Sequence, residues 1–111
     1  MSDAAYTSMF LNAAAGLATR LSVDGVAIYS VRYDYPAFGS WEFVAGRRRS
    51  RVRVVWDGKD AVLRVSAARL AGPAGAPDWR PVSETDFAKR RSEHAEIFAA
   101  AYTAIRQHAD A

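Results

Sequence analysis

Apolar residues near the N-terminus recur at intervals of three and four positions, the repeat of a helix that buries one face. The members of this stripe are Tyr6, Met9, Phe10, Ala13, Leu17 and Leu21. Ser2 or Asp3, which precede the stripe, can accept hydrogen bonds from the free backbone N–H groups of a first helical turn. Asp24 and Gly25 interrupt the pattern. The sequence therefore predicts a helix over residues 3–21.

From residue 26 to residue 69 the pattern changes to an alternation of apolar and polar positions, which is typical of strands with one buried face. Three turn-forming sequences, 34–39, 46–49 and 57–60, divide this region into four strands that we expect to form an antiparallel meander. Trp41 and Phe43 have odd numbers, whereas Val52 and Val54 have even numbers, so a turn or bulge must separate the two pairs. If residues 46–50 form only a bulge, the sheet has three long strands instead.

The pairing of these strands follows if their large apolar side chains share one face of the sheet. Between the last two strands the predicted pairs are Trp56 with Ala61, Val54 with Leu63, and Val52 with Val65. For the earlier strands they are Phe43 with Val52, Trp41 with Val54, Tyr33 with Trp41, and Val31 with Phe43. Tyr29 is expected on the same, inner face.

The region after the strands contains a loop and then a second helix. Residues 71–82 are rich in Gly and Pro, and this composition predicts the loop. Trp79 is expected to fold back onto the core, and the alternative is an exposed Trp that binds a ligand. The helix is expected from Ser83 to about Ala109, because residues 83–86 resemble a capping box. Its predicted face carries Phe87, Arg91, His94, Phe98, Tyr102 and Ile105.

The expected fold is a single α+β domain over residues 1–111, with the element order α-β-β-β-β-α. In this two-layer sandwich both helices cover the inner face of a three- to four-stranded antiparallel sheet, and the outer face is left to solvent. The chain has no cysteine, so it can form neither a disulfide nor a thiolate metal site. No segment has the roughly 18 consecutive apolar residues of a membrane span, and we expect a cytoplasmic protein with no membrane partner.

Basic residues are concentrated in the middle of the chain. Residues 44–69 contain seven Arg and one Lys against two Asp, a net charge of +6 in a chain whose total charge is +3. The arginines that alternation turns outward are Arg51, Arg53 and Arg64, and those of the neighbouring turn are Arg47, Arg48 and Arg49. One predicted row across the outer face consists of Arg32, Glu42, Arg53 and Arg64. This row sets two arginines directly opposite each other, which is mildly unfavourable.

These six arginines suggest that the partner is a polyanion such as nucleic acid, because guanidinium groups match phosphate geometry. An open sheet face can also bind single strands when exposed aromatic rings stack on the bases. In the predicted register the aromatic residues of the strands point inward, and only Tyr35 and Phe38 are available for stacking. Two other interpretations remain. In the first, the arginines only keep the sheet soluble. In the second, Val44, Val55 and Val62 form a small protein interface among the arginines.

The sequence contains no recognisable catalytic, metal-binding or cofactor-binding motif, so we expect a non-enzymatic binding domain without a cofactor. His94 and His108 are about 21 Å apart along the predicted helix and cannot share a metal ion. The competing hypothesis is a protein-interaction or homodimeric domain that uses the alanine-rich second helix. Its alanines would let another helix approach closely, and that helix could equally be the first helix of the same chain.

Overall fold

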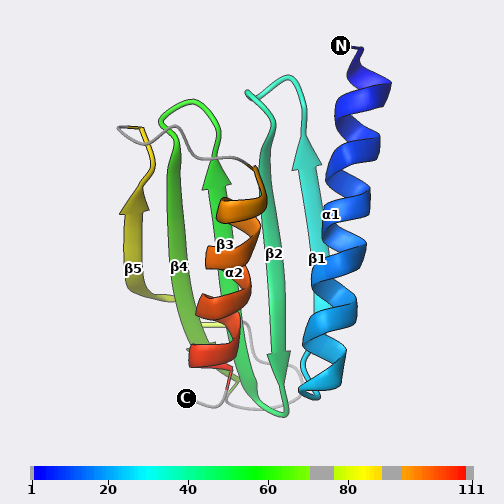
Figure 1. The fold of residues 1–111 in the computed structure, drawn as a ribbon. Helices are drawn as coiled ribbons and strands as arrows, with labels where there is room; N and C mark the ends of the chain where they lie inside the picture. Colours follow the sequence, from blue (N-terminus) through cyan, green and yellow to red (C-terminus); the bar gives the residue numbers. More distant parts are fainter. Residues whose placement is uncertain (1, 71–76, 89–93, 110–111) are drawn as a thin grey trace.

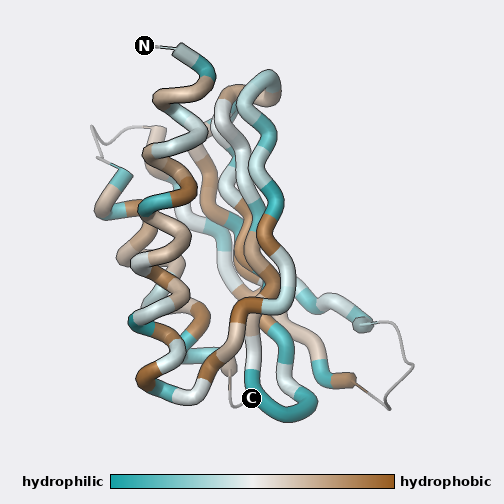
Figure 2. The backbone as a smooth tube through the Cα atoms, turned by 90° about the vertical axis from the view of Figure 1, so that its right-hand side faces the viewer, coloured by the Kyte–Doolittle hydropathy of each residue, from teal (hydrophilic) through white to brown (hydrophobic). Residues whose placement is uncertain are grey.

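The computed structural model of the chain describes residues 2–70, 77–88 and 94–109. Along the chain the elements are α1 (Asp3–Val23), β1 (Ala27–Asp34), β2 (Ser40–Arg47), β3 (Ser50–Asp57), β4 (Val62–Arg69), β5 (Arg80–Asp86) and α2 (His94–His108). The strands form one antiparallel sheet in the order β1-β2-β3-β4-β5, and both helices lie on the same face of it (Figure 1 and Figure 2). The predicted α+β sandwich is thus confirmed, with five strands instead of three or four.

Helix α1 begins where the sequence predicts and ends two residues later. The hydroxyl of Ser2 accepts a hydrogen bond of 3.2 Å from the backbone N–H of Ala5, which caps the first turn. The side chains that α1 buries are Phe10, Ala14, Leu17 and Leu21. Tyr6 and Met9 belong to the predicted stripe but are 40% and 49% exposed, because they line a cavity that is open to solvent.

The core lies between the two helices and the inner face of the sheet. Its largest fully buried side chains are Phe43, Leu21, Ile105, Val52 and Val54. Aromatic rings fill its centre: Phe10 stacks on Phe43 with ring centroids 5.8 Å apart, and Trp41 stacks on Phe98 at 4.9 Å. The face that alternation predicts to be inner is therefore the buried one.

The pairing of β1 with β2 agrees with the prediction, since Tyr33 lies opposite Trp41 and Val31 lies opposite Phe43. The two later registers were predicted wrongly, each by two residues. The observed pairs are Trp56 with Trp41 and Leu63, Val54 with Phe43 and Val65, and Val52 with Ala45 and Ala67. Because side chains alternate with a period of two, a shift of two residues leaves each of them on its predicted face.

The β2–β3 turn is tighter than predicted. Arg47 pairs with Ser50, so Arg48 and Arg49 alone connect the strands, and Arg48 adopts a left-handed φ of 57°. The backbone of Ser50 approaches Gly46 so closely that a Cβ atom on Gly46 would collide with the Ser50 carbonyl group. The short turn therefore depends on the absence of a side chain at Gly46.

The β3–β4 turn begins one residue later than predicted. The carboxylate of Asp57 accepts hydrogen bonds from the backbone N–H groups of Lys59 and Asp60, at 3.1 and 3.2 Å. These bonds close the turn directly after Asp57, which becomes the last paired residue of β3 and lies opposite Val62. The later start of the turn accounts for the shifted register of β3 and β4.

A β-bulge in β1 removes Tyr29 from its predicted place on the inner face. The pairing with β2 shifts between Ile28 and Ser30, so Tyr29 has no cross-strand partner in β2. Its side chain is 53% exposed and lies under the guanidinium group of Arg51, which projects from the outer face. The prediction is wrong because one extra residue reverses the alternation, and a count of odd and even positions cannot detect it.

Strand β5 occupies residues that the sequence assigned to a loop and to the start of the second helix. It pairs with β4, and Ser83 lies opposite Val65. Residues 83–86 therefore do not form a capping box. Pro81 has no backbone N–H group, and it is tolerated because β5 is an edge strand and the register shifts beside Ser66.

Helix α2 is shorter than predicted and begins at His94, whose side chain is exposed. The residues that it buries are Ile97, Phe98, Ala101 and Ile105, and Tyr102 is half-buried. Phe87 belongs to the predicted helical face but precedes the helix, and its buried ring meets Trp56 edge-on at 6.0 Å. Arg91, which was also assigned to that face, lies outside the described residues.

The two helices also contact each other. The hydroxyl of Tyr102 donates a hydrogen bond of 2.9 Å to the carboxylate of Asp24, and the guanidinium group of Arg20 lies 3.9 Å from the centre of the Tyr102 ring. An ion pair of 3.3 Å joins Arg106 to Asp24.

Neither of the described helices combines the length and the apolar character that a membrane crossing needs.

Candidate functional site

The outer face of the sheet carries the strand arginines that the alternating pattern predicts to point outward. Arg51 and Arg53 of β3 and Arg64 of β4 alternate with residues of the buried core. Because of the shifted register, Arg53 lies between Val44 and Ser66. The observed row through Arg64 consists of Arg32, Glu42, Val55, Arg64 and Glu84. The predicted opposition of Arg53 and Arg64 is therefore wrong, and the charges along this row alternate in sign.

Arg64 is engaged by carboxylates of its own chain. Its Nη1 atom lies 3.1 Å from a carboxylate oxygen of Asp57, and its Nε atom lies 3.5 Å from one of Glu84. The hydrogen bond from Arg64 holds the pKa of Asp57 below its ordinary value of 3.8, and the backbone N–H groups of Asp60 and Lys59 act in the same direction. Of the six candidate arginines, Arg64 is thus poorly placed to bind an external anion.

Trp79 lies against the outer face and not against the core. The guanidinium carbon of Arg53 is 5.0 Å from the centre of the Trp79 ring, and the Nε atom of Arg53 is 3.8 Å from the Glu42 carboxylate. The expectation that Trp79 folds onto the core is wrong because β5 brings it to the edge of the sheet. Nothing in the local sequence indicates against which face of the sheet the Trp79 ring packs.

Arg51 connects the outer face with the β2–β3 turn. Its guanidinium carbon lies 4.0 Å from the centre of the Tyr29 ring, and its Nη1 atom donates hydrogen bonds of 2.8 Å to the backbone carbonyls of Arg48 and Ser50. The two neighbouring outward positions of β3, Arg51 and Arg53, therefore both form guanidinium–aromatic contacts. Sequence reasoning missed both aromatic partners, since it placed them in the core.

The β2–β3 turn and the end of β4 surround a hollow of about 560 Å³. Its lining residues are Arg47, Arg48, Arg49, Ser50, Arg69 and Ala109. The side chains of Arg48, Arg49 and Arg69 are exposed. The backbone N–H group of Leu70 donates a hydrogen bond of 2.8 Å to the carbonyl of Arg49, which holds the end of β4 against the turn. Within the described parts of the chain, no carboxylate lines this hollow.

The hollow and the adjoining outer face of β3 form one candidate surface, which we call the basic end. Its members are Arg47, Arg48, Arg49, Arg51, Arg53 and Arg69. Five of these arginines were singled out from the sequence. Arg69 was missed, although it lies in the same basic stretch of chain, because only the observed β3–β4 pairing places it beside the turn through Ser50. The basic end lies at the lower end of the sheet in Figure 1.

Comparisons with known proteins add no relative to this description. A scan against protein-family models found no match, and searches of curated proteins and of solved structures found none either. Within residues 2–70, 77–88 and 94–109, no group of three His, Asp or Glu side chains is placed to hold a metal ion. The function of the basic end is therefore inferred from its own chemistry.

Proposed function

We propose that this protein binds a polyanion, single-stranded nucleic acid, through its basic end. The observation that supports this most is the convergence of Arg48, Arg49 and Arg69 on one hollow that no described carboxylate lines. Neighbouring guanidinium groups repel one another, so their convergence is unfavourable unless an anion lies between them. The guanidinium fork donates paired hydrogen bonds to phosphate oxygens, and a hollow of about 560 Å³ has room for a phosphate group with its sugar.

Two aromatic rings on the outer face favour a single strand over a duplex. Tyr29 is 53% exposed and Trp79 is half-buried, and each lies against an arginine of β3. The bases of a single strand are free to stack on such rings, and each stack contributes about 1–3 kcal/mol. In a duplex the base faces are already occupied. Phosphate contacts together with base stacking would give affinity with little sequence preference.

Self-association through the alanine-rich helix α2 has less support. The large apolar side chains of α2 are buried in the core of the same chain, and its contacts with α1 include Tyr102 and Arg106. Its exposed positions include Ala95, Ala99 and Thr103, which offer little apolar surface to a second helix. The arrangement thus favours the interpretation in which the two helices of one chain pack together.

Fluorescence anisotropy with labelled oligo-dT, oligo-U and a duplex of equal length tests the proposal. The dissociation constant should be lower for the single strands than for the duplex. Their affinity should fall as the salt concentration rises. In a plot of log affinity against log salt concentration, each phosphate contact that releases a counterion makes the negative slope steeper by about 0.7. Replacing both Arg48 and Arg49 by Gln should weaken binding about tenfold at low salt and reduce the slope by about 1.4.

The matched control replaces Arg32 and Lys59 by Gln. It removes the same charge from two exposed residues that lie outside the basic end. This control should keep the salt slope and most of the affinity, because neither side chain lines the hollow. Equal losses in the two double variants, or binding that ignores salt, would contradict the proposal.

A further inference from the structure

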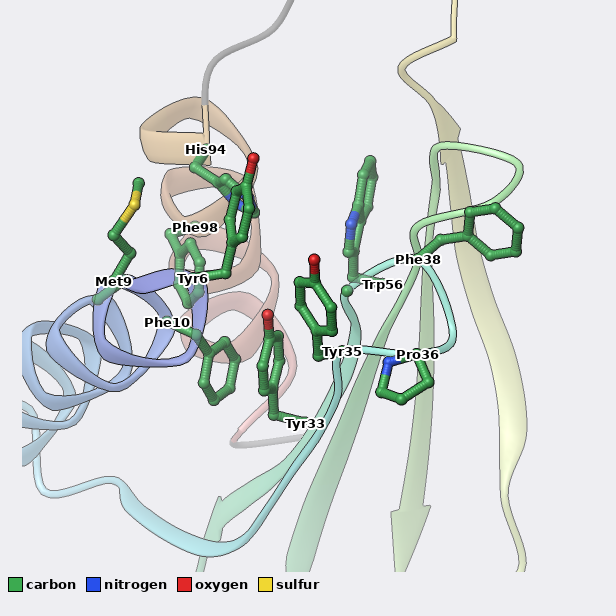
Figure 3. A pocket seen from close by; sticks show the side chains of 12 residues that line it. Tyr6, Met9, Phe10, Tyr33, Tyr35, Pro36, Phe38, Trp56, His94 and Phe98 are labelled. Carbon is green, nitrogen blue, oxygen red and sulfur yellow. The ribbon is translucent and has the colours of Figure 1, made fainter. Parts of the chain in front are cut away.

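A second cavity opens at the opposite end of the sheet from the basic end, between α1, α2 and the β1–β2 loop (Figure 3). Its volume is about 440 Å³, which lies in the range of pockets that hold small molecules. Its walls are largely aromatic and include Tyr6, Phe10, Tyr33, Tyr35, Trp56 and Phe98. No local sequence pattern predicts this cavity, because these residues come from both helices, two strands and a loop.

The inner wall of this cavity is built from packed core residues. The ring of Phe10 stacks on that of Tyr33, with centroids 4.4 Å apart and an angle of 15° between the planes. Phe10 also contacts Phe98 of α2, at 6.1 Å between ring centroids. A wall made of mutually packed rings keeps its shape, so the cavity does not require a rearrangement to admit a ligand.

The outer part of the cavity is bounded by Tyr6 and Tyr35, which are partly exposed to solvent, and by the buried Trp56. The rings of Tyr6 and Tyr35 are 5.6 Å apart and tilted by 34°, and Tyr6 is 40% exposed. In Figure 3 the rings of Tyr6, Tyr35 and Trp56 stand around one space, with both hydroxyl groups pointing to the same side. Large apolar side chains that gather unburied around a cavity are typical of a binding site.

The charges near the cavity favour a cation over an anion. Loss of hydration raises the pKa of Tyr33 and of Tyr35 above the ordinary value of 10.0, and the nearby carboxylate of Asp3 raises both further. Both hydroxyls therefore stay neutral at physiological pH, with a carboxylate close to them. The described lining residues include His94 but neither Lys nor Arg.

We propose that this cavity binds a small organic cation that carries a quaternary or methylated ammonium group. The faces of Trp and Tyr rings attract such a cation through their π electrons. Its methyl groups lose water against apolar walls, and Asp3 supplies a complementary charge. A phosphate or carboxylate ligand would be repelled by Asp3 and would find no described Lys or Arg to bind. The site is separate from the basic end, since none of the residues that the structure describes lines both cavities.

Choline and its uncharged isostere 3,3-dimethyl-1-butanol test this proposal, because the two molecules share a shape and differ in charge. Binding is followed by proton–nitrogen correlation NMR on the whole chain, with the indole N–H of Trp56 as reporter. Choline should shift this signal with a dissociation constant of about 1 mM or below, and the isostere should bind at least about tenfold more weakly. Equal affinities, or no shift with choline, would overturn the proposal.

Variants of exposed residues separate binding from folding. Tyr6→Ala removes one ring and should weaken choline binding about fivefold or more, whereas Tyr6→Phe keeps the ring and should retain it. Asp3→Asn should weaken binding about threefold through the lost charge. Leu11→Ala is the matched control, because Leu11 is an exposed apolar residue of α1 that does not line the cavity. A loss in Leu11→Ala as large as that in Tyr6→Ala would contradict the assignment of the site.

Discussion

Arg51, Arg53 and Arg64 share one face of the sheet but differ in what holds them. Arg64 lies between two carboxylates, Arg53 between a carboxylate and an indole ring, and Arg51 over a phenol ring. Alternation along the strands predicts the direction of all three side chains. Of their partners it places only Glu42 beside Arg53, because the others lie at a turn, at the edge strand and at a bulge. The availability of an arginine to a ligand depends on these partners.

At the residue scale, Trp79 should contribute to the binding of single strands. Trp79→Ala should raise their dissociation constant about five- to a hundredfold, because the ring offers a stacking surface beside Arg53. Trp79→Phe keeps an aromatic face and should lose much less. Anisotropy titrations with oligo-dT measure both variants, and urea unfolding checks that each remains folded. Equal binding by the two variants would show that stacking on Trp79 does not contribute.

Asp57 should make the stability of the fold depend on acid pH. Its pKa is lower in the folded protein than the ordinary 3.8, so its contribution is present above about 3.8 and is lost as the pH falls through the folded-state pKa. Asp57→Asn keeps an oxygen for the turn but loses the charge that pairs with Arg64. The variant should be less stable than the natural chain at about pH 6, and the difference should be smaller at about pH 3, where the carboxylate of the unfolded chain is largely protonated. Urea unfolding at both pH values measures this, and a difference that persists undiminished in acid would contradict it.

At the scale of elements, the β2–β3 hairpin shows how one turn sets the position of a site. The two-residue connection sets Ser50 opposite Arg47, and the β3–β4 pairing sets Arg69 opposite the same Ser50, which brings the end of β4 beside the turn. Arg51 then donates to the carbonyls of Arg48 and Ser50. The hollow therefore depends on the registers of both strand pairs, β2 with β3 and β3 with β4.

Gly46 should be required for this hairpin. Gly46→Ala should lower the free energy of unfolding by about 2–3 kcal/mol, because its Cβ would collide with the Ser50 carbonyl. Gly16→Ala is the matched control, since Gly16 lies in α1 with open space around a new Cβ, and it should raise the free energy of unfolding by about 0.5–1 kcal/mol. Urea unfolding gives both values. If the two substitutions have the same effect, the close approach at Gly46 does not control the turn.

Although the total charge of the molecule is small, its two ends differ in charge and in chemistry. The total of +3 combines a basic end at the β2–β3 turn with an aromatic cavity near Asp3 at the other end of the sheet. Both helices lie on the inner face (Figure 2), so neither of them covers Arg51 and Arg53, which are half-buried on the outer face. The same two layers thus carry the two proposed sites, one for an anion and one for a cation.

The amino-acid pattern alone predicts the first helix, the antiparallel meander and the face on which the large apolar side chains of β2, β3 and β4 lie. This succeeded because a side-chain period of two survives a register error of two residues, as Trp56 and Val54 show. It also singled out five of the six arginines of the basic end, although their role stays a prediction.

The remaining features depend on contacts between segments that are distant in the sequence. The bulge at Tyr29 reverses the alternation locally, and β5 forms because β4 offers it a free edge, although its residues resemble a loop and a helix start. The place of Trp79 follows from β5, and the convergence of Arg69 with Arg48 follows from the β2–β3 and β3–β4 pairings. The aromatic cavity follows from the packing of both helices beside the β1–β2 loop. Local sequence patterns report periodicity and turn chemistry, whereas a site is made by residues that meet only when distant segments pair.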